Sequence, residues 1–330
     1  MTKTLRWGVL STAKIGLKYV IPAMQHAAFT EIRGIASRNA ESAQQAAAVL
    51  GIPKAYGSYE ALLADPDIDA VYNPLPNHLH LPWTLRALEA GKHVLCEKPL
   101  GLNAAEVEQF QQSAAAHPNL VLAEAFMYRH HPQWAYVIGQ VRSGLIGRVQ
   151  TVHAHFSYFN TDAGNIRNKP EYGGGGLLDI GCYCVSSSRW IFGREPDEVA
   201  AFMVNDPAFG TDRLASGILR FGDATATFSS ATAANLWQGL IITGDEGRIE
   251  IPVPFNPPPD QPAKIRIFAR GEARETEIPP ANHFTLQAEH FARLVSGEAT
   301  PVIPLEESHA NLRILDAIRE SAQTRRVVQV

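Results

Sequence analysis

The sequence predicts a two-domain protein, with a doubly wound parallel sheet (α/β) over residues 1–125 and an α+β domain with a mainly antiparallel open sheet over residues 126–330. Up to about Glu124, short apolar strands alternate with helical stretches, which is the pattern of repeated βα units and a parallel sheet. From Val149 onward, strands follow one another through short turns, as in antiparallel sheets. A chain of 330 residues is long enough for two domains that each have a core.

The N-terminal half begins with a strand, a turn of small residues and a helix. Leu5–Leu10 predicts the strand and Ser11–Gly16 the turn, and apolar residues then recur at helical spacing as far as Met24. Later strands are expected at Ile32–Ala36, around Tyr56, at Ile68–Tyr72, from His93 and at Leu120–Glu124, with helices at Ala40–Leu50, Tyr59–Ala64, Pro82–Ala90 and Ala104–His117. Gly51 and Gly91 end two of these helices, as glycine commonly does.

The C-terminal half begins with one more expected helix, Phe126–Val141, and a turn at Ser143–Gly147. Strands are then expected at Val149–Tyr158, Val199–Val204, Leu214–Phe221, Ala224–Ala231, Leu240–Thr243, Arg248–Ile251 and Ile265–Ala269. The proline-rich stretch Pro252–Pro262 predicts a surface loop or rigid connector. Helices at Phe284–Val295 and Glu306–Thr324 are expected to close the chain.

Composition excludes several classes of function. A net charge of −4 and a pI near 6.3 provide no basic surface for a nucleic acid or an anionic membrane. The three cysteines, Cys96, Cys182 and Cys184, have neither a disulfide framework nor zinc-ligand spacing. No charged-then-apolar leader opens the chain, and no apolar run approaches the roughly 20 residues that span a bilayer. We therefore expect a cytoplasmic protein without a metal site.

The turn after the first strand has the context of a dinucleotide-binding site. Backbone N–H groups at the start of the following helix can meet a pyrophosphate, and the turn offers Ser11, Thr12, Ala13, Lys14 and Ile15 for this role. The glycine pattern is imperfect, because Ser11, Ala13 and Gly16 stand where the fingerprint has three glycines. Taken alone, the motif fits a plain βα turn equally well.

The second strand ends in Ser37-Arg38-Asn39, where an NAD-selective enzyme usually has an acidic residue for the ribose 2′-hydroxyl. An arginine there accommodates a 2′-phosphate, so Ser37 and Arg38 indicate NADP. Without the preceding turn, a solvated loop arginine would be the preferred interpretation.

Two further strand ends carry residues suited to a nucleotide site. The fourth strand runs into Asn73–His80, whose two prolines predict a rigid loop; His78 and His80 have no accompanying carboxylates or cysteines, which disfavours a metal. The next strand ends in Glu97-Lys98-Pro99, at the edge where open α/β sheets bind ligands. A lone lysine in a loop is usually a solvated cation, but this position favours a functional one.

A second polar cluster lies between Phe159 and Arg189. The polar loop Asn160–Asn168 is followed by four glycines and by Leu177–Tyr183. If a helix begins near Leu178, Asp179 and Tyr183 share a face, with the acid in the first turn, where its charge is favoured. A capping aspartate beside a packed tyrosine would explain the same pattern.

With Glu97-Lys98-Pro99 and Gly176–Tyr183 both present, the chain resembles the glucose–fructose oxidoreductase, inositol dehydrogenase and rhizopine catabolism family (Gfo/Idh/MocA) over essentially its whole length. It looks closest to the subgroup that holds glucose–fructose oxidoreductase and the NADP-dependent xylose and dihydrodiol dehydrogenases. That subgroup has Asp followed four residues later by Tyr, as Asp179 and Tyr183 stand here. Ser11 and Ala13 depart from its glycine turn.

The resemblance implies an N-terminal NAD(P)-binding Rossmann domain and a C-terminal domain for substrate binding and oligomerisation. The expected function is NADP-dependent hydride transfer with a sugar or polyol, NAD being a possible cofactor. The implied site residues are: catalytic, Lys98, Tyr183 and Asp179; cofactor-binding, Ser11, Thr12, Ala13, Lys14, Ile15, Ser37, Arg38, Tyr56, Leu75, Pro76, Asn77, His80, Glu97 and Lys98; substrate-binding, Asn165, Arg167, Asp179 and Tyr183.

By this resemblance Tyr183 is the acid/base and Lys98 the polarising cation, with Asp179 orienting the substrate hydroxyl or the lysine. A free tyrosine has a pKa near 10, and a neighbouring cation favours the phenolate. The proton-transfer roles of Lys98 and Tyr183 are interchangeable at this stage. Two alternatives stay open: a sugar–sugar oxidoreductase with tightly held NADP, and a non-catalytic nucleotide-binding regulator, which the complete set of three residues disfavours.

The strand-rich domain also predicts assembly. A sheet with helices mainly on one side leaves its other face in need of cover, and Ala224–Phe228 suggests that this face is partly apolar. We expect a homodimer or homotetramer formed through the C-terminal sheet.

Overall fold

The computed structural model describes residues 2–330 and divides into two compact units. The first unit comprises the residues up to Gly101, Ala105–His130 and Asn282–Ser308. The second comprises Leu102–Ala104, His131–Ala281 and the residues from His309 onward. Residues 282–308 therefore belong with the N-terminal strands, whereas a single boundary after residue 125 would assign them to the C-terminal domain.

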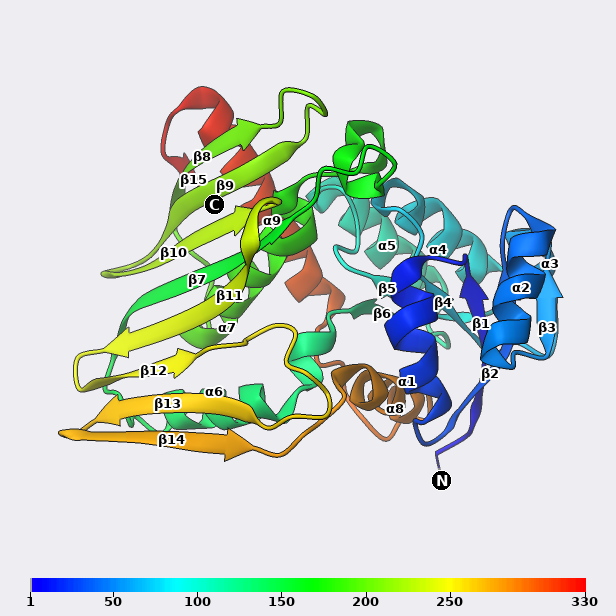
Figure 1. Cartoon of the computed structure of the whole chain (residues 1–330), viewed down its shortest axis with the longest axis horizontal. Helices are drawn as coiled ribbons and strands as arrows, with labels where there is room; N and C mark the ends of the chain where they lie inside the picture. The colour runs from blue at the N-terminus through cyan, green and yellow to red at the C-terminus, as the bar shows by residue number, and fades with distance from the viewer. Residues whose placement is uncertain (1) are drawn as a thin grey trace. The chain divides into compact units, whose positions relative to one another are not determined.

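Within residues 2–330, the first unit is built on a sheet of six parallel strands, as the sequence predicts (Figure 1). The strands are β1 Leu5–Leu10, β2 Thr30–Ala36, β3 Lys54–Tyr56, β4 Ala70–Asn73, β5 His93–Glu97 and β6 Leu122–Ala125. Their order in the sheet is β3-β2-β1-β4-β5-β6, that of a doubly wound Rossmann fold. Because the strands are parallel, their carboxyl ends lie along one edge, and the strand order reverses between β1 and β4.

Most helices of the first unit follow the predicted positions. They are α1 Ile21–Gln25, α2 Ala40–Leu50, α3 Tyr59–Leu63, α4 His80–Glu89, α5 Ala104–Ala116 and α8 His283–Val295. A π-helical turn, Gly16–Val20, precedes α1. The side chains of Asn39, Ser58 and Asn282 accept hydrogen bonds from the first turns of α2, α3 and α8, which fixes where these helices begin.

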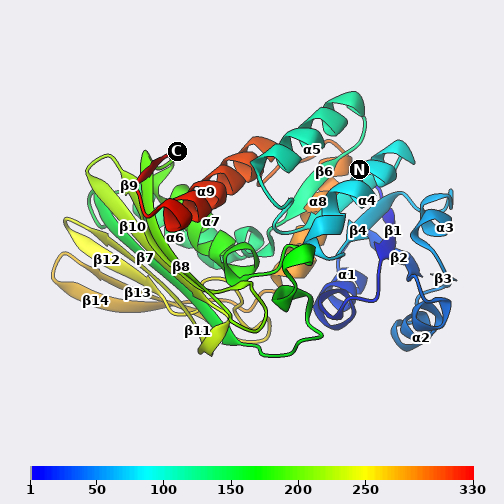
Figure 2. The ribbon, with the colours of Figure 1, turned by 90° about the horizontal axis from the view of Figure 1, so that it is seen from above.

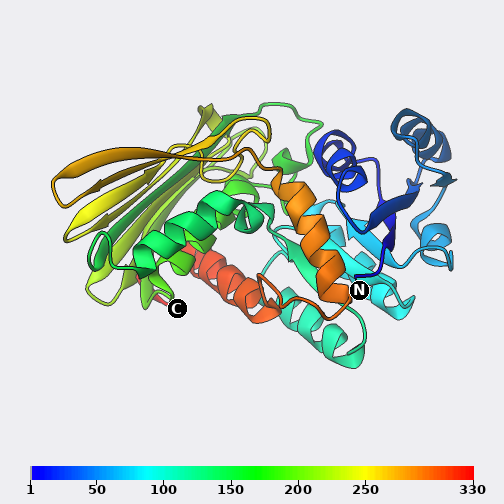
Figure 3. The same ribbon diagram turned by 90° about the horizontal axis from the view of Figure 1, so that it is seen from below.

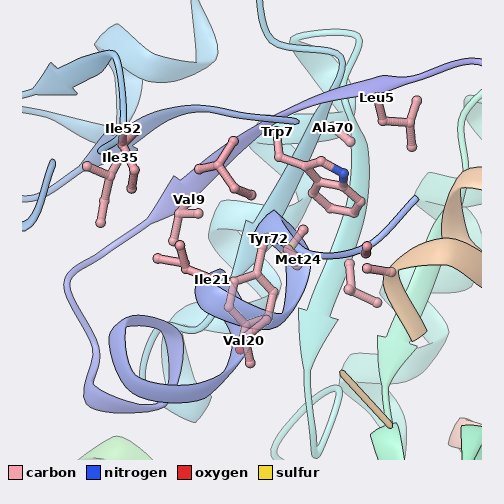
Figure 4. Packing of buried hydrophobic residues seen from close by; sticks show 14 of the residues in the cluster. Leu5, Trp7, Val9, Val20, Ile21, Met24, Ile35, Ile52, Ala70 and Tyr72 are labelled. Carbon is pink, nitrogen blue, oxygen red and sulfur yellow. The ribbon is translucent and has the colours of Figure 1, made fainter. Parts of the chain in front are cut away.

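The core of the first unit explains why α8 belongs to it. Figure 4 shows Trp7, Val9, Ile21 and Tyr72 gathered between the strands and α1. The ring of Trp7 lies 5.0 Å from that of Phe291 on α8, centroid to centroid. Burial of large apolar side chains stabilises by about 1.5–3 kcal/mol each, so α8 contributes to the stability of this sheet although it is distant in sequence.

The opposite face of β1 is in close contact with α3 because residue 8 is glycine. A Cβ atom on Gly8 would lie 2.5 Å from Cδ2 of Leu62, on α3. A side chain at residue 8 would therefore force the Leu62 side chain to move away from the strand that leads into the predicted nucleotide turn.

In the described part of the chain, the second unit contains a nine-stranded, mostly antiparallel sheet, which confirms the predicted fold class. Its strands are β7 Val149–Phe159, β8 Glu198–Asn205, β9 Asp212–Phe221, β10 Ala224–Ala231, β11 Ala233–Gly244, β12 Gly247–Ile251, β13 Ala263–Ala269, β14 Glu272–Ile278 and β15 Val328–Gln329. The order is β14-β13-β12-β11-β7-β10-β9-β8-β15, and β10 pairs with β7 in parallel. The sequence did not predict β14, β15 or the first half of β11.

The helices of the second unit are α6 Pro132–Arg142, α7 Cys182–Phe192 and most of α9, Leu305–Thr324. Figures 2 and 3 show α6 and α9 on one face of the nine-stranded sheet. The opposite face carries exposed apolar side chains, among them Phe202, Ile218 and Trp237.

The single helix predicted over Phe126–Val141 is wrong. The segment forms a 3-10 turn, Met127–His130, and then α6 from Pro132, with His131 extended between them (φ −73°, ψ 131°). Proline has no N–H to continue a helix and disfavours helical geometry at the residue before it, so Pro132 begins a new helix. In residues 2–330, no helix combines the length and apolarity needed to cross a membrane.

Candidate active site

The loops at the carboxyl edge of the six-stranded sheet contain the predicted cofactor residues. Ser11–Ile15 follow β1, Leu75–Asn77 follow β4, and these two strands flank the point where the strand order reverses. Ser37 and Arg38 follow β2, and Lys98 follows β5. Open α/β sheets bind ligands at this reversal point, so the fold brings these loops to one edge.

The turn after β1 keeps a tight shape without the first glycine of the fingerprint. Ser11 has a φ of 105°, a left-handed conformation that is unusual for any residue but glycine. Its N–H donates to the Ala36 carbonyl at 2.9 Å, and its Oγ accepts from the Ala13 N–H at 3.2 Å. A glycine would adopt this φ without strain. In its place, the Ser11 hydroxyl stabilises the turn through its hydrogen bond.

The exit of β2 holds an exposed arginine beside a buried serine. Ser37 is buried, its N–H donates to the Tyr56 carbonyl at 3.0 Å, and its Oγ accepts from the Asn39 N–H at 3.2 Å. Burial raises the pKa of Tyr59, while the charge of Arg38 and a hydrogen bond from it act in the opposite direction. The Arg38 guanidinium thus lies near Tyr59 with an exposed surface, which fits recognition of a phosphate.

The side chain of Tyr56 is directed at an ion-pair network. Its hydroxyl donates to the Asp65 carboxylate, which Lys54 Nζ also contacts at 2.7 Å. Burial and the Asp65 carboxylate raise the pKa of Tyr56 to about 12. A nucleotide would therefore meet the ring or the backbone of Tyr56 rather than a hydroxyl available for proton transfer.

The loops after β4 and β5 are linked by polar side chains. The Tyr72 hydroxyl donates to Glu97 Oε1 at 2.7 Å, and the Lys98 N–H donates to Glu97 Oε2 at 3.3 Å. Lys98 itself is half-buried, and the Lys98–Pro99 peptide bond is cis. Glu97 therefore supports the strand ends on which Lys98 is carried.

His80 has a different environment from the one expected of a cofactor contact. It is 1% exposed, with Nδ1 2.9 Å from the Pro99 carbonyl and Nε2 2.7 Å from the Leu75 carbonyl. Burial lowers its pKa to about 4. The ring joins the loops after β4 and β5 from inside the unit.

In the second unit, the Asp179 carboxylate is held by two side chains. Its Oδ2 accepts from the Tyr158 hydroxyl at 2.6 Å and from Arg167 Nε at 2.7 Å, and Asp179 is 9% exposed. Asn165 positions the arginine, because its side chain accepts from the Arg167 N–H at 3.0 Å. Burial and the Asp179 charge raise the pKa of Tyr158, and the same carboxylate raises that of Arg167.

Tyr158 is a site residue that the sequence analysis missed. It lies near the end of β7, immediately before the polar loop that contains Asn165 and Arg167. A tyrosine where a strand meets a polar loop could have identified Tyr158 as a candidate from the sequence. The hydrogen bond itself depends on how β7 packs against the turn that carries Asp179.

The glycine run before Asp179 is required by close backbone packing. A Cβ on Gly175, whose φ is 111°, would lie 1.9 Å from Oδ1 of Asp212. Oδ2 of the same carboxylate accepts from the Leu177 N–H at 2.6 Å, at the start of a π-helical turn, Leu177–Gly181. Asp212 therefore fixes the beginning of the helical segment that carries the catalytic candidates.

Tyr183 lies in the first turn of α7 and is 3% exposed. Its ring packs against Phe156 and Phe255, at centroid distances of 5.8 and 5.3 Å. Phe255 belongs to the proline-rich segment predicted to be a loop. The aromatic contacts hold the tyrosine in place one helical turn after Asp179.

The described residues thus form two clusters, one in each unit. The first unit contains the nucleotide candidates and Lys98, and the second contains Asn165, Arg167, Asp179 and Tyr183. Side chains in the first cluster suit a dinucleotide, because Lys14 and Arg38 are exposed cations beside backbone turns that offer N–H donors. Within residues 2–330, no group of three or more His, Cys, Asp or Glu side chains is arranged to hold a metal ion.

Two family models match the chain. One, described as an oxidoreductase family with an NAD-binding Rossmann fold (GFO_IDH_MocA), matches residues 5–125. The other, described as the GFO/IDH/MocA C-terminal domain, matches residues 134–250. The two matches include the predicted nucleotide loops of the first unit and the Asp179 cluster of the second.

Individual proteins are similar over nearly the whole length. The chain is 40% identical over 331 residues to D-xylose 1-dehydrogenase (NADP(+)) 2 of Haloferax volcanii, with 99% of this chain and 100% of that protein covered. The solved structure of KijD10, a 3-ketoreductase from Actinomadura kijaniata in complex with NADP and TDP-benzene, has a TM-score of 0.92 at 30% identity, covering 97% of this chain and 98% of that one. An aldose-aldose oxidoreductase from Caulobacter crescentus complexed with glycerol also has a TM-score of 0.92, at 27% identity, covering 99% of this chain and 100% of that one.

Proposed function

The chain belongs to the Gfo/Idh/MocA oxidoreductase family, and from this premise we propose that it is an NADP-dependent dehydrogenase of a sugar or similar polyol, of the aldose dehydrogenase type. The observation that carries the proposal is the buried Asp179 carboxylate, held by Tyr158 and Arg167 four residues before Tyr183. A fixed carboxylate and a phenol on one helical segment are suited to binding and deprotonating a hydroxyl group.

NADP is proposed as the preferred cofactor, with NAD as the weaker alternative. The support is Arg38, an exposed cation after β2 where NAD-selective enzymes usually have an acid. The Haloferax relative is named as an NADP-dependent enzyme, and KijD10 was solved with NADP. When bound, the nicotinamide ring would supply the acceptor for the hydride.

The residues of the chain would then divide the remaining work. Tyr183, as a phenolate that the Lys98 cation would stabilise, would take the proton from the substrate hydroxyl and become a neutral phenol. Asp179, fixed by Arg167, would accept a hydrogen bond from the substrate and so orient it. The exchange of proton-transfer roles between Lys98 and Tyr183 is a second version of the same proposal.

A second candidate function is transfer of hydride between two sugars by a protein that never releases its NADP. The similarity of the chain to the aldose-aldose oxidoreductase supports this second candidate. The two functions differ in one observable property, because the second requires nucleotide to remain bound through purification.

The same proposal assigns residues 1–125 to NAD(P) binding and residues 126–330 to substrate binding and oligomerisation. A homodimer or homotetramer is supported by the exposed apolar face of the nine-stranded sheet. A cytoplasmic location is supported by Cys96, Cys182 and Cys184, all of which are buried as free thiols.

The test is a screen of aldoses, polyols and trans-dihydrodiols with NADP⁺ and with NAD⁺, in which the absorbance of the reduced cofactor measures the reaction. The purified protein is first denatured, and any released nucleotide is measured. Sugar-dependent NADPH formation supports the dehydrogenase, whereas bound nucleotide with activity only on sugar pairs supports the alternative. Nucleotide binding without turnover on any member of the panel would contradict both.

A further inference from the structure

A buried carboxylate lies one strand away from Lys98 and has no part in the function proposed above. Glu124 is on β6, where it pairs in register with Cys96 of β5, just before the loop that carries Lys98. Glu124 is 4% exposed. Moving a carboxylate from water into the protein interior costs free energy, so the burial of Glu124 requires an explanation.

Both oxygens of Glu124 have defined partners. Oε1 accepts from the backbone N–H of Leu100 at 2.9 Å, and Oε2 accepts from the Ser308 hydroxyl at 2.6 Å. Leu100 is two residues after Lys98. Glu124 is therefore joined directly to the turn that presents the lysine, and Ser308 fixes its orientation.

The other side of this turn is held by His80. Its Nδ1 lies 2.9 Å from the carbonyl of Pro99, the residue between Lys98 and Leu100. Two buried side chains, one from α4 and one from β6, thus contact consecutive residues of the Lys98–Leu100 turn. This arrangement leaves the backbone under Lys98 little freedom to move.

Charged and titratable side chains surround Glu124 on β5 and the loop after it, on α9 and on the Met127–His130 turn. Lys98 after β5 attracts a negative charge on Glu124, and Glu307 on α9 opposes it, although Glu307 is itself paired with Arg129 at 2.8 Å. The Cys96 thiol on β5 also interacts with the carboxylate. Burial raises the pKa of Glu124 to about 7, while hydrogen bonds from Ser308 and Leu100 act in the opposite direction. Glu124 therefore changes its charge close to neutrality.

We propose that Glu124 is a positioning residue for Lys98: its carboxylate fixes the Lys98–Leu100 turn and, when ionised, supplies the buried negative charge that stabilises the Lys98 ammonium. The proposal rests on the catalytic role proposed for Lys98. Protonation removes the charge, so wild-type turnover should decline as the pH falls through about 7. In this way catalysis depends on a buried group that acts through the Lys98–Leu100 turn.

Glu124→Gln tests the proposal, because the amide oxygen can still accept from Leu100 while the charge is lost. We expect kcat on the high-pH plateau, where wild-type Glu124 is ionised, to fall about tenfold, and the acid limb near pH 7 to disappear. NADP affinity should stay within about twofold of wild type. An unchanged kcat with an unchanged pH profile would overturn the proposal.

Ser308→Ala is the matched variant. It keeps the carboxylate but removes a donor that favours its ionised form, so the acid limb should move to higher pH while the kcat plateau at high pH is unchanged. If Glu124→Gln does not fold, this shift still decides the proposal. No shift in Ser308→Ala would count against it.

A measurement that needs no turnover separates this proposal from the proposed function. The Glu124 carboxyl can be followed by ¹³C NMR, identified by its absence in Glu124→Gln, in wild type and in Lys98→Met. Loss of the lysine charge should raise the Glu124 midpoint, and an unchanged midpoint would reject the coupling. Failure of the wild type to oxidise any sugar would reject the function, while the NMR result would still decide the coupling.

Discussion

At the scale of single residues, Arg38 offers the most direct test of cofactor choice. If its guanidinium binds the 2′-phosphate, it makes charge-assisted hydrogen bonds that NAD cannot reproduce. Arg38→Ala should therefore weaken NADP binding by about 1.5–3 kcal/mol, the usual range for hydrogen bonds to charged groups, and leave NAD binding almost unchanged. Calorimetric titration with both nucleotides measures the difference.

Arg293→Ala is the matched control for Arg38. Arg293 lies on α8 of the same unit and pairs with Glu289. The end of α8 lies near the start of β1, where the Lys3 N–H donates to Ser296 Oγ at 3.1 Å, away from the carboxyl edge of the sheet. Its replacement should leave both affinities as they are. Equal losses for NADP and NAD in Arg38→Ala would make Arg38 a structural residue.

Tyr183→Phe tests the reaction centre with the smallest possible change. The ring contacts with Phe156 and Phe255 remain, so the fold and the nucleotide site should survive. If the hydroxyl transfers the proton, turnover should fall about 10²–10⁴-fold, the usual value of a positioned acid/base, while NADP affinity stays near wild type. Steady-state kinetics on the substrate found in the screen gives the answer.

Tyr136→Phe removes a hydroxyl from α6, where it lies 3.2 Å from Thr276 Oγ1, and should leave turnover unchanged. A tyrosine that is merely packed predicts near-normal turnover and lower stability for Tyr183→Phe, which would leave Lys98 as the remaining candidate. The double variant with Lys98→Ala should be far from additive, because two groups that act on one proton form a unit.

At the scale of secondary-structure elements, the start of the helical segment that carries Asp179 and Tyr183 depends on Gly175. An alanine there would combine a strained left-handed backbone with a Cβ that overlaps Asp212. Gly175→Ala should lower the free energy of unfolding by more than about 2 kcal/mol, beyond the backbone strain alone. Chemical denaturation measures the loss.

Gly193→Ala is the control, because Gly193 ends α7 with a φ of 65° and an added Cβ would meet no atom within 4 Å. It should cost only the backbone penalty of about 1–2 kcal/mol. Equal losses in the two variants would mean that the contact with Asp212 contributes nothing to the stability of the helix start.

The same scale explains what the sequence could predict. Buried strands such as β1 and β4 consist mostly of apolar residues, so their positions and the parallel sheet were predictable. The edge strand β14 is exposed along almost its whole length and therefore has no apolar alternation. The start of a new helix at Pro132 was also predictable, because proline favours the first position of a helix.

The candidate site was predictable only in part, for a physical reason. Strand ends and short motifs identified Arg38, Lys98 and Asp179 as candidates from neighbouring residues alone. The hydrogen bond from Tyr158 to Asp179 and the contact of Glu124 with Leu100 join segments 21 and 24 residues apart. Such contacts arise from strand packing, which one sequence does not specify.

At the scale of the whole molecule, buried histidines make stability depend on pH. Burial lowers the pKa of His80 to about 4 and that of His130 to about 3, against an ordinary value of 6.5. Both are neutral in the folded protein, whereas the unfolded chain binds protons below pH 6.5. Stability should therefore fall as the pH drops from 6.5 towards 4, by on the order of 3 kcal/mol for His80.

The raised pKa of Glu124 acts in the opposite direction, because the folded protein binds that proton more readily than the unfolded chain. The comparison is therefore made between wild type and His80→Gln, by denaturant unfolding at several pH values. The variant should lose less stability between pH 6.5 and 4 than wild type does. Parallel curves would show that His80 does not titrate on unfolding in this range.

Assembly is the last property that the fold makes testable. The face of the nine-stranded sheet opposite α6 and α9 exposes Phe202, Ile218 and Trp237, and exposed apolar surface of this kind marks an interface or causes aggregation. The ion pairs of β12 to β14, such as Arg266 with Glu275, continue the same face and suit a polar rim. Homodimerisation through this face would bury the apolar centre and leave the charged strands at its border.

We expect wild type to have the mass of at least two chains at micromolar concentration in sedimentation equilibrium. Phe202→Glu replaces a side chain that is 77% exposed on β8, and should give monomers because an unpaired charge would be buried in the interface. Val49→Glu makes the same kind of change at a residue that is 84% exposed on α2, outside the sheet, and should leave the mass as in wild type. A monomeric wild type would contradict the predicted assembly, and an oligomer that survives Phe202→Glu would move the interface away from this part of the sheet.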